Sequence, residues 1–134
     1  MRFSQRSSSA VKALSFPFVC IALAACAQGG EQYQVRKLPS GREVRLVSVM
    51  PIRFQNGETS LMLTYQTPLK VGDSVNLRAE IQDIWATFRT DAENAHVQSA
   101  IISAVEVPSG FILKKSTGHN FVFERAADGS WHML

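Results

Sequence analysis

Two cysteines and three histidines are the most reactive side chains of this chain. A thiolate can act as a nucleophile, ligate a metal or carry a covalent modification, and an imidazole can act as a general base or a metal ligand. Cys26 closes the run Leu23-Ala24-Ala25-Cys26, whereas Cys20 follows Pro17-Phe18-Val19. Small residues at the end of an apolar stretch are typical of a processing site in an exported precursor. Cys26 is therefore the first candidate for chemistry.

The histidines form no recognisable set. His96, His119 and His132 lack a metal-ligand spacing such as i, i+4 on a helix, and no acidic cluster adjoins them. Surface or loop-end positions are the interpretation for these residues. His119 stands in Gly118-His119-Asn120, which predicts a turn, and with Trp131 it makes up a speculative binding surface. We predict no catalytic residues, no metal site and no cofactor.

The segment before Cys26 has the order of an export signal. Residues 1–12 carry Arg2, Arg6 and Lys12 and no acid, and Ala13–Ala25 is almost wholly apolar. A basic start, a short apolar run and small residues are typical of a secretory signal. As a helix this run would reach only about 20 Å, whereas a hydrocarbon core is about 30 Å thick. We predict that residues 1–25 are a signal peptide and not a permanent transmembrane helix.

Leu23-Ala24-Ala25-Cys26 resembles the lipobox of bacterial lipoproteins. In that family the Cys thiol receives a diacylglyceryl group, the chain is cut before this Cys, and the new amine also takes a fatty acid such as palmitate. The resemblance implies lipidation at Cys26, and Ala27 in place of Asp implies an outer-membrane anchor facing the periplasm. The alternative is an ordinary secretory cut after Ala25-Cys26-Ala27, which would release a soluble periplasmic or secreted protein.

Composition limits what the exported part does. The chain has 14 Lys and Arg against 11 Asp and Glu, and three of the bases precede Cys26, so the remainder is formally neutral. Without a cluster of bases, we predict no nucleic-acid binding. With Cys20 removed and Cys26 lipidated, the domain has no disulfide. We predict a flexible tether over residues 26–32 and a single domain over residues 33–134.

A hairpin is predicted around Asn56-Gly57. Large apolar residues alternate with polar ones from Val44 to Phe54, and an Asn-Gly pair is the strongest short hairpin signal. A two-residue loop would place all large apolar side chains on one face. Pro51 has no N–H, so its nitrogen is predicted to point away from the partner strand. The predicted pairs are Phe54 with Thr59, Ile52 with Leu61, and Met50 with Leu63.

One long helix is predicted from about Asp73 to Asn94, with Asp73 or Ser74 as its cap. The predicted buried stripe comprises Leu77, Ile81, Ile84, Trp85, Phe88, Ala92 and Ala95. The predicted solvent side comprises Arg78, Glu80, Asp83, Arg89 and Glu93. Core packing, not a ligand groove, is the interpretation for the helix aromatics.

Strands are predicted on both sides of this helix. The first spans 33–38 and ends at Pro39-Ser40-Gly41; the later ones are 97–107, 111–115, 121–123 and 131–134, with turns at Thr117-Gly118 and Asp128-Gly129. The order predicts an α+β fold: a hairpin, one long helix and a β-meander in an antiparallel sheet, with the helix packed on one face.

Outside the lipobox the chain resembles no characterised family, and no catalytic set stands out. The first hypothesis is a lipid-anchored periplasmic protein that works by binding, as an accessory component of the cell envelope. The alternatives are an inhibitor or immunity-type lipoprotein that docks on one exported protein through its sheet, and a small envelope hydrolase that uses His119 with a carboxylate.

Overall fold

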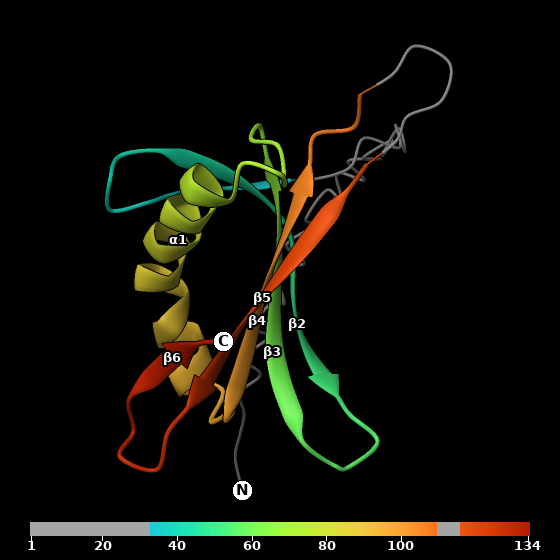
Figure 1. Ribbon diagram of the computed structural model, residues 1–134. Helices are drawn as coiled ribbons and strands as arrows, with labels where there is room; N and C mark the ends of the chain where they lie inside the picture. Colours follow the sequence, from blue (N-terminus) through green and yellow to red (C-terminus); the bar gives the residue numbers. More distant parts are fainter. Residues whose placement is uncertain (1–32, 110–115) are drawn as a thin grey trace, which may run out of the picture. The chain divides into compact units, whose positions relative to one another are not determined.

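The computed structural model describes residues 33–109 and 116–134, which belong to one compact unit of the chain. Three strands, one helix and three further strands follow one another (Figure 1). The elements are β1 Gln34–Lys37, β2 Glu43–Arg53, β3 Thr59–Thr67, α1 Ser74–Asn94, β4 Ser99–Glu106, β5 Gly118–Arg125 and β6 Trp131–Met133. The predicted helix and most predicted strands are confirmed. The predicted strand over 111–115 lies outside the described residues.

Turns of the same construction join three of the antiparallel strand pairs: β1–β2, β2–β3 and β5–β6. The Phe54 N–H donates to the Glu58 carbonyl at 2.8 Å, and the Gly57 N–H donates to the Phe54 carbonyl at 3.0 Å. The loops after Leu38 and after Ala126 repeat this pair of bonds. Their glycines, Gly41, Gly57 and Gly129, have φ of 85°, 88° and 85°. Each is a three-residue loop that ends on a left-handed glycine.

The third loop residue changes the register of the β2–β3 hairpin. Met50 pairs with Met62, Ile52 with Ser60 and Arg53 with Thr59, so the predicted pairing is wrong by one residue. A shift of one residue moves a side chain to the other face of the sheet. Met50 and Ile52 therefore do not share a face with Leu61 and Leu63.

A β-bulge at Val47 separates the two halves of β2. Its register with β3 shifts between Leu46 and Ser48. Before the bulge, Val44 and Leu46 are buried in the core, whereas Met50 beyond it is 48% exposed. The bulge thus reverses which residues of the strand face the core. The large apolar residues of β2 alternate with other residues in the sequence, but they point to the core before the bulge and to the other face after it.

The sheet is mixed, so the prediction of a wholly antiparallel sheet is wrong. Its order is β1-β2-β3-β4-β5-β6, with β3 and β4 parallel in the centre and every other pair antiparallel. The reason is the crossover: α1 returns the chain along the sheet, so β4 starts at the end where β3 started. The predicted single hairpin before the helix is a three-stranded meander, because β1 pairs with β2. The predicted turn at Thr117-Gly118 is also wrong, since Gly118 is the first residue of β5 and pairs with Val105 of β4.

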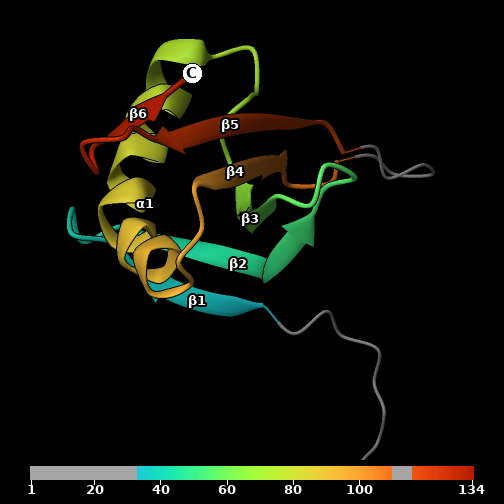
Figure 2. The same cartoon turned by 90° about the horizontal axis from the view of Figure 1, so that it is seen from below.

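The helix lies on one face of the sheet, as predicted (Figures 1 and 2). Asp73 is its N-cap and accepts the Asn76 N–H at 3.4 Å. Trp85 of α1 stacks on Phe123 of β5, with ring centroids 4.0 Å apart and planes 9° from parallel. Leu63, Phe88 and Ile102 are fully buried between the layers. The core interpretation of the helix aromatics is thus confirmed.

The helix ends at a histidine in a left-handed conformation. Ala95 is the C-cap and His96 has φ of 55°. The His96 N–H donates to Glu93 at 3.1 Å and the Val97 N–H to Ala92 at 3.4 Å, which is the Schellman pattern of bonds. Glycine is preferred at this position because it has no Cβ to strain the backbone.

We predict that His96→Gly stabilises the domain by about 0.5–1 kcal/mol, because it relieves the left-handed strain at an exposed site. His96→Ala is the matched control, since alanine keeps the Cβ and removes only the imidazole. Urea unfolding measures both. Equal stabilities of the two variants would contradict the role assigned to the backbone.

Candidate binding surface

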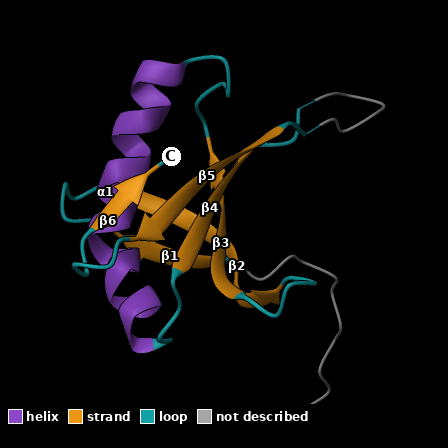
Figure 3. Cartoon of the chain, turned by 60° about the horizontal axis from the view of Figure 1, so that its bottom comes forward, coloured by secondary structure: helices purple, strands orange, loops and turns teal. Residues whose placement is uncertain are grey.

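The face of the sheet opposite α1, called here the open face, is covered by no other described element (Figure 3). One row of apolar side chains crosses it, because the register aligns one residue from each of four strands. This row is Met50, Met62, Ile101 and Val122. The neighbouring rows are mostly polar and comprise Ile52, Ser60, Ser99 and Glu124 on one side, and Ser48, Thr64, Ser103 and Asn120 on the other.

A hollow of about 680 Å³ lies at the end of the open face beside the β2–β3 turn. Phe54, Ile101 and Val122 give it an apolar floor and wall. The Ser60 and Ser99 hydroxyls contact each other in it, and Glu58 and Glu124 line it with carboxylates. A neighbouring hollow of about 390 Å³ shares both glutamates and also includes His96. Apolar surface with a few convergent polar groups suits binding.

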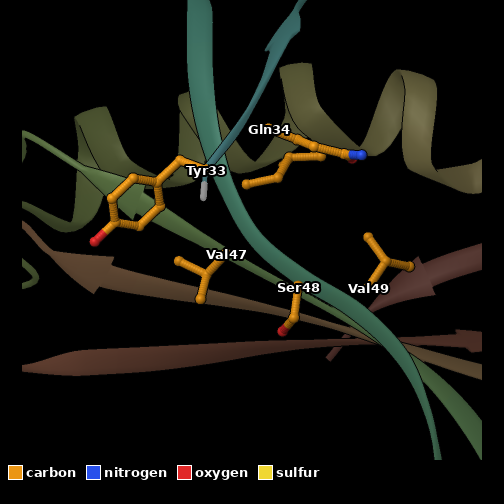
Figure 4. A pocket seen from close by; sticks show the side chains of 6 residues that line it. Tyr33, Gln34, Val47, Ser48 and Val49 are labelled. Atoms are coloured by element: carbon orange, nitrogen blue, oxygen red, sulfur yellow. The ribbon is translucent and has the colours of Figure 1, made fainter. Parts of the chain in front are cut away.

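A second region lies at the sheet edge, beside the bulge of β2 (Figure 4). Its hollow of about 610 Å³ is lined by Tyr33, Gln34, Leu46, Val47, Ser48 and Val49. Since β1 pairs only as far as Leu46, no described strand pairs with the outer edge of β2 beyond the bulge. Hydrogen-bonded and non-hydrogen-bonded pairs alternate along β2 and β3, starting from the bond between Phe54 and Glu58. Pro51 falls in a non-hydrogen-bonded pair, so its nitrogen points away from β3, as predicted. A proline here removes a donor and weakens this edge as a site for strand addition.

His119 and Trp131 do not form one surface. His119 lies exposed near the start of β5, not in a turn, and its ring contacts Phe121 with centroids 4.8 Å apart. Trp131 of β6 pairs with Arg125 at the other end of β5, about 20 Å away at the usual rise along a strand. Half-buried, it packs edge-on against Trp85 with centroids 5.2 Å apart. Its position on the rim of the core favours packing.

Among the described residues, no hydrogen bond or ion pair joins His119 to an acid, and no group of His, Asp and Glu side chains could hold a metal ion. His96 ends the helix, and His132 of β6 stands across from Glu124. In the described part of the chain, His119 therefore has no carboxylate within hydrogen-bonding reach, as the hydrolase hypothesis would require.

A buried polar cluster joins the helix to the sheet. Glu80 of α1 is 1% exposed and accepts the Tyr65 O–H at 2.8 Å. Its other oxygen accepts from the Arg42 guanidinium at 2.6 Å. Burial raises the pKa of the Tyr65 phenol well above its usual range, and the Glu80 carboxylate raises it further.

The prediction that Glu80 faces solvent is wrong. Glu80 is three residues after Leu77 and four before Ile84, so helical spacing places it on the buried stripe. Two further contacts tie the same side of α1 to the sheet: Arg36 pairs with Asp91 at 3.0 Å, and the Ser40 hydroxyl contacts Asp83. The solvent side predicted for α1 is therefore partly occupied by contacts with β1 and the first turn.

Comparison with protein-family models, curated proteins and solved structures finds no match to this chain. The helix of the described region lacks the length of apolar sequence that a membrane span requires.

We predict that Arg42→Met lowers the free energy of unfolding by about 1–3 kcal/mol, because it leaves the buried Glu80 carboxylate without its cation. Arg45→Met is the matched control: Arg45 lies three residues further along the chain, in β2, and forms no ion pair among the described residues. Its expected effect is within about 0.5 kcal/mol. Chemical denaturation compares the two, and equal losses would contradict the importance of the cluster.

The raised pKa of Tyr65 predicts a loss of stability in alkali. A raised folded-state pKa contributes stability below the unfolded pKa of about 10 and loses it as the pH rises beyond that value. The free energy of unfolding should therefore fall between about pH 10 and 11.5. Tyr65→Phe should show a smaller fall over this interval, whereas Tyr33→Phe should follow the parent protein. Identical slopes for all three proteins would rule out the contribution.

Proposed function

We propose that this chain is a lipid-anchored protein of the bacterial cell envelope that works by binding, without catalysis of its own. The observation that carries the proposal is Leu23-Ala24-Ala25-Cys26 at the end of a short apolar run. The lipid would join Cys26, and residue Ala27 favours the outer membrane.

The physics of the anchor favours a position close to the membrane. One acyl chain gives only marginal membrane binding, whereas two or more give a stable anchor. Residues 26–32 can extend no further than about 25 Å. A domain on such a tether meets partners at or near the membrane surface.

The open face supports binding as the activity. An apolar row bordered by serines, threonine and glutamates has the composition of a protein interface, with an apolar centre and a polar rim. The Ser60 and Ser99 hydroxyls contact each other, so each has its partner within the sheet and both form part of the wall of the hollow. These features favour a surface that recognises another surface.

The second candidate function is an inhibitor or immunity-type lipoprotein that docks on one exported protein through its sheet. The open face favours it for the same reason, and the difference is the number of partners. Affinity capture from envelope extract with the parent chain would recover one stoichiometric protein in this case. A general accessory role predicts several partners in lower amounts.

Metabolic labelling with an alkyne fatty acid tests the anchor. We predict that the parent chain takes up label and stays with the membrane fraction, whereas Cys26→Ser loses both properties. Cys20→Ser is the matched control and should label as the parent does, because its cysteine is removed with the signal. Equal labelling of all three chains, or no labelling of any, would overturn the proposal.

A further inference from the structure

We propose that two copies of this chain pair through their open faces, with Arg45 of each copy beside Glu124 of the other. The inference rests on the proposed function because it uses the same binding surface and names the partner as a second copy. Arg45 and Glu124 both lie on the open face, at opposite corners of its four central strands. Neither forms an ion pair among the described residues.

The positions of these charges define a two-fold axis. The distance across the sheet between Arg45 on β2 and Glu124 on β5 is three strand spacings, or about 14 Å. Arg45 is level with Gly118, six residues before Glu124, which adds about 20 Å along the strands. An axis in the plane of the interface and perpendicular to this diagonal brings each arginine onto the partner's glutamate, twice.

The same axis passes over the apolar centre of the open face. The midpoint of the line from Arg45 to Glu124 lies between β3 and β4. If the sheet is treated as flat, with the usual spacing between strands and the usual rise along them, the axis passes within about 1.5 Å of the Met50 and Met62 positions. Each methionine would therefore meet its own counterpart. The strands of the two sheets would cross at about 70°, near the orthogonal class of sheet packing. Flexible methionines suit such a contact because they adapt to irregular surfaces.

The expected interface is small. Four strands by seven residues cover about 440 Å² in projection on each copy, or about 900 Å² for the pair. Stable interfaces bury about 1,200–2,000 Å² or more, so this dimer should be weak in dilute solution. A lipid anchor would confine both copies to one surface and raise their effective concentration. We therefore expect dimers mainly on the membrane.

Cysteine cross-linking of the full chain in intact cells tests the pairing. Met62→Cys, near the axis, should give a disulfide-linked dimer on mild oxidation. Val35→Cys is the matched control: it is an exposed aliphatic position of the same face, 61% exposed. In the proposed pair the two Val35 positions would lie about 30 Å apart, so Val35→Cys should give no disulfide-linked dimer. The parent chain reports any cross-linking through Cys20 or Cys26.

Charge reversal tests the register of the pair. In the Met62→Cys background, Arg45→Glu or Glu124→Arg should lower the dimer yield about fivefold or more, because each reversal acts at both symmetric contacts. The double reversal should restore it. Arg53→Glu, on the same strand but outside the predicted contact, should have no effect.

Four results would each overturn the pairing. The first is that Met62→Cys gives no dimer, and the second is that Val35→Cys gives the same yield as Met62→Cys. The third is that Met62→Cys forms adducts only with other proteins, and the fourth is that the double reversal fails to restore the yield. Fatty-acid labelling of the same samples reports the anchor separately. Labelled chains that do not cross-link would therefore remove the dimer and leave the proposed function intact.

Discussion

A single helix can cover only one face of a six-stranded sheet, and this constraint decides where the chain is buried and where it is exposed. The face under α1 receives the largest apolar side chains, including Leu63, Phe88 and Phe123. The other face is built from smaller and mixed residues, with Met50, Met62, Ile101 and Val122 in one row. Burial of apolar area drives folding in proportion to the area removed from water, so the helix side supplies most of the stability. Since no other described element covers the open face, this face can serve association.

The position of the helix depends on more than apolar contact. Glu80 is held between Tyr65 and Arg42, and Asp91 pairs with Arg36 on β1. A buried carboxylate that loses a partner is costly, so these bonds favour one placement of α1 over a displaced one. The polar contacts gather on the β1–β2 side, whereas aromatic stacking of Trp85 on Phe123 fixes the β5 side.

Local patterns in the sequence were sufficient for much of the fold. The helix follows from its spacing and from Asp73 as its cap, and each of the three glycine turns joins two strands. The pairing could not be predicted as reliably, because Asn56-Gly57 suits both a two-residue loop and the last two positions of a three-residue loop. One residue of difference moves Met50 and Ile52 to the open face.

The strand–helix–strand order could have indicated the parallel pairing of β3 with β4, because a crossover helix returns the chain along the sheet. The bulge at Val47 depends on tertiary packing, which no local pattern in this chain records. For the candidate site, helical spacing could have placed Glu80 in the core, but its identity as an acid favoured solvent. His119 and Trp131 are separated by the length of β5, which sequence proximity did not reveal.

With the proposed anchor at Cys26, the open face would give a domain that is held at a membrane and presents a surface that no other described element covers. The face depends on the β2–β3 register, which NMR of the labelled domain measures directly. Pairs between ladder bonds have close α-protons. We expect α-proton contacts between Val49 and Leu63 and between Pro51 and Leu61. Contacts between Met50 and Leu63 and between Ile52 and Leu61 would contradict it, because these residues would then share the face under the helix.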